Sequence, residues 1–260
     1  MIRLRGMAVE PITSRSPRPV RRSTLVQEWR ELMFLHWPVE PARVAGLLPP
    51  GTRPDVLDGV TYVGLVPFRM HRVDLPAGPG VPYFGSFCET NVRLYSVDDA
   101  GRRGVVFRSL NAARLLPVVV GRVGVRLPYV WSKMRLDRDG DVITYTSRRR
   151  WPGPREVTSR VVARVGPPIV EQGGLERFLT ARWGLHVSWY GRTWYLPNEH
   201  PQWPLHHAEL LDLDDSLVTA AGLSAPATSP VSVLYSPGVP VRFGTPVPVD
   251  RQAPGPRTLS

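Results

Sequence analysis

Four side chains that could take part in chemistry recur at every second position between residues 89 and 95. They are Glu89, Asn91, Arg93 and Tyr95. Because successive side chains of a strand point to opposite faces, this spacing puts all four on one face. Such a face is either exposed to solvent, or it lines a pocket in a curved sheet, where a carboxyl and a guanidinium can polarise a small ligand. Under the pocket interpretation Glu89 is a candidate acid or base, and the other three are candidate substrate-binding residues.

A second alternating stretch carries Tyr129, Trp131, Lys133 and Arg135. Lysine forms a Schiff base with a ketone only when it is neutral, and desolvation or a nearby cation such as Arg135 promotes that state. Lys133 is the single lysine of the sequence, which makes it a candidate catalytic residue together with Tyr129. The alternative is an ordinary surface lysine whose stem covers apolar surface.

Other familiar catalytic patterns are missing from the sequence. The six histidines form neither a His-Glu-x-x-His pattern nor a cluster with cysteine, and adjacent His206 and His207 would point to opposite sides of a strand. No Gly-x-Ser-x-Gly motif supplies a serine nucleophile, and no glycine-rich phosphate loop joins a strand to a helix. We therefore expect no metal and no cofactor.

The elements that must position these side chains are mostly hairpins. Turn residues 98–101 separate two stretches rich in β-formers, and a second turn signal, 137–141, separates the next pair. Helical spacing of Leu175, Phe178, Leu179 and Trp183 predicts one helix, and a second is favoured over residues 112–125. Strands are also predicted within residues 56–70, 157–165, 186–195, 208–213 and 231–235. Hairpins with few helices predict an α+β fold built on a mainly antiparallel sheet.

Composition bounds the domain organisation and the partners. The formal charge is +11, but six arginines and one glutamate in residues 1–24 contribute +5 of it, with prolines between them. We expect residues 1–24 to be a disordered Arg/Pro-rich tail, residues 25–245 to be one domain, and residues 246–260 to be a Pro-rich tail. The run Arg148, Arg149 and Arg150 follows a strand-like stretch and is typical of a solvated strand end, so no specific nucleic acid is expected.

Localisation follows from what the sequence lacks. No stretch reaches the roughly 18 apolar residues of a membrane span, and the N-terminal residues have no apolar core of a secretory signal. The single cysteine, Cys88, excludes an internal disulfide. We expect a cytoplasmic protein without a membrane partner; self-association into a homo-oligomer stays open.

Several multi-residue blocks occur in an order that resembles the bacterial YqjF family. They are Phe34-Leu35-His36-Trp37-Pro38-Val39, Leu47-Leu48-Pro49-Pro50-Gly51, Val63-Gly64-Leu65-Val66-Pro67-Phe68-Arg69-Met70, Glu89-Thr90-Asn91-Val92-Arg93-Leu94-Tyr95, Leu127-Pro128-Tyr129, Trp203-Pro204-Leu205 and Ala220-Ala221-Gly222-Leu223. The resemblance covers about residues 28 to 245. It implies membership of the acetoacetate decarboxylase-like superfamily, hence a curved, cone- or barrel-like antiparallel sheet with a few packed helices and an enclosed pocket.

The same resemblance implies site residues and one departure. In the decarboxylase a Schiff-base lysine follows a Gly-x-Pro-type turn, with a second lysine beside it. Here Pro128 matches the proline, but Tyr129 and Val130 stand where the two lysines belong, and Lys133 comes four residues after Tyr129. The resemblance also implies that Glu89 matches a pocket glutamate, which favours a pocket over an exposed face.

Two functional hypotheses follow. The first is a lyase or hydratase-like enzyme that acts on a small oxo or carboxylic acid or ketone: Arg93 would hold a carboxylate, Glu89 would serve as acid or base, and Tyr129 would donate a hydrogen bond. The second is a non-catalytic ligand-binding or structural protein on the same fold. A closed pocket that contains Glu89, Arg93 and Tyr129 would support either hypothesis, whereas exposure of these side chains on an outer face would exclude the pocket.

Overall fold

Long stretches in which apolar side chains alternate between two faces fold into strands that are buried on both sides. The structure is a computed structural model, and it describes residues 8–74, 86–114 and 127–249. Its strands are β1 (Leu25–Val39), β2 (Thr52–Pro54), β3 (Thr61–Asp74), β4 (Phe87–Asp98), β5 (Arg103–Ala112), β6 (Tyr129–Asp139), β7 (Val142–Trp151), β8 (Thr158–Pro168), β9 (Gly184–Trp189), β10 (Arg192–Glu199), β11 (His206–Asp215), β12 (Ser232–Phe243) and β13 (Val247–Pro248). The described helices are short: α1 (Pro41–Ala45), α3 (Gly174–Thr180) and α4 (Leu217–Ala220).

The described strands form two closed rings that share a wall. Strands β12, β1, β3, β4 and β5 are the wall, and each pairs antiparallel with its neighbour. Strands β6, β7, β8 and β11 connect β5 to β12 and close a nine-strand ring. At the other ends of β5 and β12, strands β9 and β10 close a seven-strand ring. Pairings are antiparallel except β5–β6 and β5–β9, so the barrel is mixed but mostly antiparallel.

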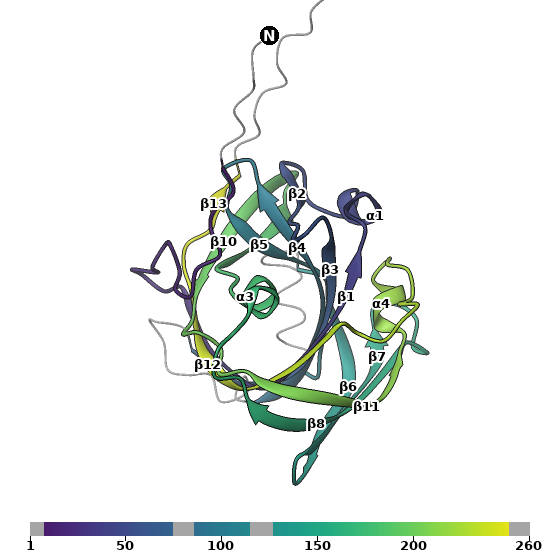
Figure 1. Cartoon of the computed structure of the whole chain (residues 1–260). Coiled ribbons are helices and arrows are strands. Elements are labelled where there is room, and N and C mark those ends of the chain that lie inside the picture. The colour runs from purple at the N-terminus through teal and green to yellow at the C-terminus, as the bar shows by residue number, and fades with distance from the viewer. Residues whose placement is uncertain (1–7, 75–85, 115–126, 250–260) are drawn as a thin grey trace, which may run out of the picture.

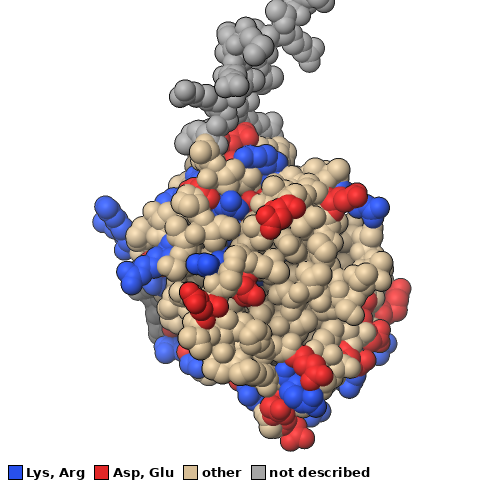
Figure 2. All heavy atoms as spheres, in the orientation of Figure 1, with Lys and Arg blue, Asp and Glu red and all other residues tan. Residues whose placement is uncertain are grey.

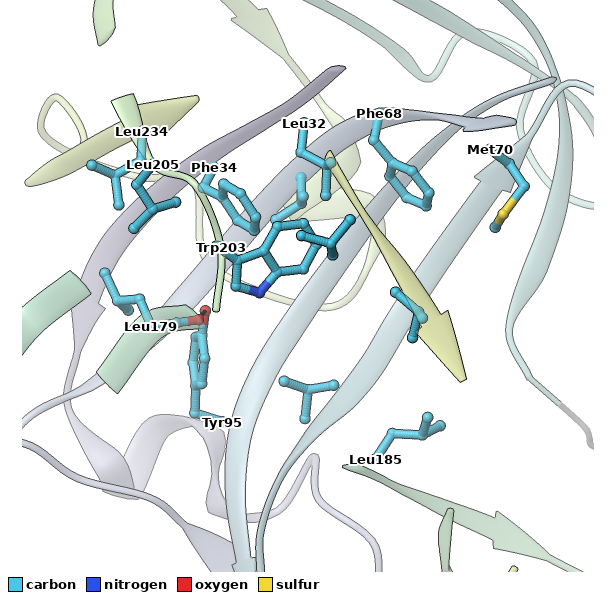
Figure 3. Packing of buried hydrophobic residues seen from close by; sticks show 14 of the residues in the cluster. Leu32, Phe34, Phe68, Met70, Tyr95, Leu179, Leu185, Trp203, Leu205 and Leu234 are labelled. Atoms are coloured by element: carbon cyan, nitrogen blue, oxygen red, sulfur yellow. Dashed lines mark hydrogen bonds between the residues drawn. The ribbon is translucent and has the colours of Figure 1, made fainter. Parts of the chain in front are cut away.

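Each face of the shared wall contributes to a different core. Leu32 and Phe34 of β1 pack inside the seven-strand ring with α3, whereas Met33 and Leu35 pack inside the nine-strand ring. Figure 1 looks into the seven-strand ring and shows α3 within it, with β6, β7, β8 and β11 beyond the wall. In Figure 3 Trp203 lies among the side chains of this first core, and its ring meets Phe34 edge-on with centroids 5.4 Å apart.

The predicted sheet is confirmed, and several element bounds need correction. The helix expected around Leu175 ends at Thr180, before Trp183. The single strand expected over residues 186–195 is the hairpin β9–β10, because Tyr190 and Gly191 adopt positive φ values of 48° and 73° and turn the chain. The helix favoured over residues 112–125 falls largely outside the described residues; Ala112 itself ends β5.

The described parts of both terminal segments, residues 8–24 and 246–249, lie against the barrel, which corrects the expectation of disorder for residues 8–24. The Glu10 amide donates to the Gly101 carbonyl over 3.0 Å, and the side chain of Val20 is buried. A guanidinium nitrogen of Arg18 donates to the Tyr195 hydroxyl over 2.9 Å. At the other end β13 pairs with β10. Backbone hydrogen bonds and apolar burial order these segments despite their arginine and proline content.

No helix in the described ranges is both long and apolar enough to cross a membrane.

Candidate functional site

The inner face of β4 brings the four side chains spaced by two into the interior of the seven-strand ring. β4 lies between β3 and β5, so that neither of its edges is open along this stretch. Glu89 and Asn91 are each 3% exposed, Arg93 is 7% exposed and Tyr95 is fully buried. The solvent-exposed interpretation of this face is therefore wrong, and the burial that a pocket requires is present.

Glu89 of β4 meets Tyr129 of β6 across β5, which pairs with both strands. The Tyr129 hydroxyl donates to Oε2 of Glu89 over 3.4 Å. Tyr129 reaches this position because β6 pairs parallel with β5, with Tyr129 opposite Leu110. Burial raises the pKa of Glu89 from 4.5 to about 8, although the hydrogen bond from Tyr129 opposes the shift. Glu89 is therefore mostly a neutral carboxylic acid at pH 7, able to donate a proton inside the ring.

Arg93 is a buried cation whose guanidinium faces rings and a carbonyl. One terminal nitrogen donates to the Leu179 carbonyl of α3 over 3.3 Å, and the guanidinium carbon lies 5.4 Å from the centre of the Phe34 ring. Among the described residues no carboxylate lies within ion-pair distance of Arg93, so it does not pair with Glu89. A buried cation of this kind is suited to the carboxylate of a ligand.

Two buried polar atoms on this face of β4 lack hydrogen-bond partners in the described part of the chain. Nε of Arg93 and Oδ1 of Asn91 are buried and have no hydrogen-bond partner among the described residues. Buried polar groups are normally hydrogen-bonded, because an unmade bond costs about 1–3 kcal/mol. Gly64 on β3 leaves room for this arrangement: a Cβ there would lie 3.1 Å from Cγ of Arg93. The face thus offers a donor and an acceptor to a ligand.

Tyr95 and His36 form the far end of the same face. The Tyr95 hydroxyl donates to the Leu179 carbonyl over 3.1 Å, so its oxygen accepts the hydrogen bond from Nε2 of His36 over 2.7 Å. Burial, aided by Arg93 and Arg182, holds the pKa of His36 well below 6.5, so the ring is neutral. Tyr95 therefore serves to fix His36 and α3, and both of its hydrogen-bonding roles are occupied.

His36 is a member of this cluster that sequence reasoning missed. We treated the histidines only as metal ligands, and no group of three His, Cys, Asp or Glu within the described ranges could hold a metal ion. The signal was present in the alternation of β1: His36 shares a face with Leu32 and Phe34, and a histidine within an apolar run is buried with a polar partner.

Lys133 does not join the cluster, which corrects its assignment as a catalytic residue. Four residues along a strand correspond to about 13 Å, and Lys133 lies that far beyond Tyr129 on β6. Its side chain is exposed and lines a groove on the outer surface. The sequence has no other lysine, so no buried lysine is available for a Schiff base.

A serine, a histidine and an aspartate also meet, at a place the sequence did not indicate. Oγ of Ser96 lies 2.8 Å from Nδ1 of His186, and Nε2 of His186 lies 3.3 Å from Oδ2 of Asp98. None of the three is more than 1% exposed. A nucleophile must reach its substrate, and Ser96 is fully buried, so the three residues do not present a hydrolase site. Their contacts instead link β4 to β9.

Comparisons with known proteins agree with the architecture. Residues 26–240 match the model of the family DUF2071, described as an uncharacterised conserved protein. The chain is 28% identical over 207 residues to the uncharacterised protein YqjF of Bacillus subtilis (strain 168), covering 79% of this chain and 84% of that protein.

Solved structures show the same fold at low sequence identity. The enduracididine biosynthesis enzyme MppR complexed with pyruvate superposes with a TM-score of 0.62 at 15% identity, over 88% of this chain and 92% of that one. An acetoacetate decarboxylase-like enzyme from Sphingomonas wittichii RW1 gives a TM-score of 0.59 at 13% identity, over 88% and 94%. The fold is therefore acetoacetate decarboxylase-like, as the resemblance to the YqjF family implied.

Proposed function

The chain belongs to the DUF2071 family, and from that premise we propose that the inner face of β4 binds a small oxo or carboxylic acid and acts on it as a lyase or hydratase. One observation carries the proposal: the buried Arg93 has no carboxylate partner in the described part of the chain, and the buried, protonated Glu89 lies on the same face. A cation and a neutral acid on one buried face are complementary to a ligand that has a carboxylate and a carbonyl.

In this proposal each side chain has a distinct role. Arg93 holds the ligand carboxylate, and Oδ1 of Asn91 accepts a hydrogen bond from a hydroxyl group of the ligand. Glu89 donates its proton to a hydroxyl group of the ligand as the C–O bond breaks and water leaves. The resulting carboxylate removes a proton from the adjacent carbon as the C=C bond forms, so that Glu89 ends the step protonated again; hydration is the reverse. Tyr129 holds the Glu89 carboxyl in place through its hydroxyl. Covalent catalysis through a lysine is not part of the proposal, because Tyr129 and Val130 occupy the positions expected for the lysine pair.

Binding is tested by thermal unfolding with pyruvate and a panel of 2- and 3-oxo acids. Pyruvate is the first ligand to test because a solved protein of this fold is complexed with it. We expect a ligand to raise the unfolding temperature of the wild type by mass action. The Arg93→Met variant should lose this shift, and Arg177→Met, at an exposed arginine of α3, should keep it. Equal shifts in the wild type and the Arg93 variant would contradict the proposed carboxylate site.

Turnover separates the enzyme from the second candidate, a non-catalytic binding protein. The missing lysine pair is the observation that favours the second candidate. Proton NMR of the wild type with each bound acid should show its conversion, and Glu89→Gln should keep binding while conversion stops. Binding that depends on Arg93 without any conversion would favour the non-catalytic role. Borohydride added to these mixtures should leave no adduct on Lys133 by mass spectrometry, and an adduct would restore the Schiff-base mechanism.

A further inference from the structure

The outer surface at the end of the β6–β7 hairpin carries a groove of about 860 Å³, a volume within the range of small-ligand sites. Its described lining comprises Trp131, Lys133, Arg148, Arg149, Arg150, Trp151 and Arg155, so it holds five cations, two indoles and no acid. On the face seen in Figure 2 basic and acidic side chains are instead interspersed.

Four of these cations are exposed and available to a ligand. They are Lys133, Arg148, Arg150 and Arg155. None of the four lies within ion-pair distance of a carboxylate of the described residues, whereas exposed Arg160 of β8 pairs with Asp212. The positive charge of the groove is therefore not neutralised from within this part of the chain, and it attracts anions.

Arg149 is the exception, because it points into the nine-strand ring. Its Nε donates to Oδ1 of Asn111 over 3.0 Å, and a terminal nitrogen donates to Oγ of Ser109 over 2.8 Å. These bonds anchor the end of β7 to β5. The basic run predicted to be a solvated strand end is thus one buried anchor between two exposed cations.

The two tryptophans give the groove flat apolar faces. Trp131 and Trp151 are paired across β6 and β7, so their side chains leave the hairpin on the same face. The guanidinium carbon of Arg150 lies 4.8 Å from the centre of the Trp131 ring, a cation–π contact. Trp151 is 53% exposed, a large indole area left in contact with water.

We propose that this groove binds a nucleotide unit, in which a phosphate meets the arginines and a base stacks on an indole. Charge alone would suit any anion, but the exposed Trp151 beside the cations matches ligands that join an anion to a flat ring. A free mononucleotide and a single-stranded nucleic acid present the same unit. The site is separate from the interior face of β4, and it does not depend on the function proposed for Glu89 and Arg93.

The test uses three probes with the full chain: a short fluorescein-labelled oligothymidylate, adenosine monophosphate, and linear polyphosphate, which has charge but no rings. Oligothymidylate binding is followed by anisotropy and the others by tryptophan fluorescence. We expect the oligonucleotide, the mononucleotide or both to bind. Preference for the oligonucleotide would identify a single-strand site, and equal affinity a mononucleotide site.

Variants at exposed positions assign the contacts. Trp151→Ala should weaken binding about tenfold, the loss expected for one stacked base. The double variant Arg148→Ala/Arg150→Ala should weaken binding and reduce the salt dependence of the logarithm of the affinity by about 2, roughly one for each phosphate-contacting cation. The matched control is Arg192→Ala. Arg192 is an exposed arginine of β10, outside the groove, and its guanidinium lies 5.9 Å from the centre of the Trp194 ring. This variant should change neither the affinity nor its salt dependence.

Two results would overturn the proposal. One is the absence of binding by both nucleotide probes. The other is that polyphosphate binds as tightly as the oligonucleotide while Trp151→Ala leaves the affinity for the oligonucleotide unchanged. That pattern would show binding of polyanions by charge alone, without stacking on the indole. Thermal unfolding of each variant checks that the barrel is intact.

Discussion

Replacing Glu89 by glutamine should make the protein more stable at neutral pH, even though it removes a candidate catalytic group. The native state keeps the Glu89 proton up to a pKa of about 8, whereas an unfolded chain loses it near 4.5. Between these values the native state binds more protons than the unfolded state, so the free energy of unfolding falls as pH rises. The fall is about 1.4 kcal/mol for each pH unit, or about 3 kcal/mol between pH 4.5 and pH 7.

The amide of glutamine does not titrate, so Glu89→Gln lacks this loss. Urea unfolding of both proteins at a series of pH values from 4.5 to 8 measures the difference. The stability of the variant relative to the wild type should grow with pH by about 3 kcal/mol up to pH 7. Tyr129→Phe removes the hydrogen bond that opposes the pKa shift, so the falling limb of that variant should extend to higher pH.

The matched control is Glu171→Gln, at an exposed glutamate, which should leave the pH profile of the wild type unchanged. A stability difference between Glu89→Gln and the wild type that stays constant from pH 4.5 to 8 would refute the reasoning. It would mean that Glu89 is ionised in the native state, with a counter-charge or solvent at the carboxyl.

Three further outcomes follow from buried or constrained groups. The pKa of His36 is held well below 6.5, so between that pKa and 6.5 the unfolded state binds a proton that the native state does not. This contribution lowers the free energy of unfolding as pH drops below 6.5 and opposes the Glu89 contribution, so the stability of His36→Phe relative to the wild type should rise as pH drops from 6.5 to 4.5. Asp55→Asn leaves the buried guanidinium of Arg182 without its carboxylate and should cost about 3–5 kcal/mol in urea unfolding. Gly238 has φ 122°, and a Cβ there would lie 1.9 Å from a backbone oxygen, so Gly238→Ala should lower the free energy of unfolding in urea by about 4 kcal/mol or more. The control is Gly140→Ala, at φ 59° in open space, which should lower it by about 1 kcal/mol.

Local patterns predicted the strands well and the chain reversals less well. The period of two over β3 places Tyr62 and Val66 on one face and Val63 and Leu65 on the other, and the two pairs face different cores. The reversal at Tyr190 was missed because a tyrosine rarely adopts a positive φ, and the single Gly191 within a strand-like stretch is a weak turn signal. Helix α3 is shorter than its apolar spacing predicted, since Trp183 lies beyond its end and is buried against the barrel by tertiary packing.

The sequence by itself determined that Glu89, Asn91, Arg93 and Tyr95 share a face, because a strand repeats every two residues whatever surrounds it. It could not determine that this face is buried, because burial depends on β9 and β10 closing the ring through pairings between distant segments. Lys133 illustrates the same limit. Alternation places it on the face of Tyr129, but β6 pairs with β5 only from Tyr129 to Trp131 among the described residues. Beyond that point β6 stays paired with β7, and the face that carries Lys133 is on the outside of the nine-strand ring. Tertiary pairing therefore decided that Tyr129, on this face of β6, points to the interior and that Lys133, on the same face, points to solvent.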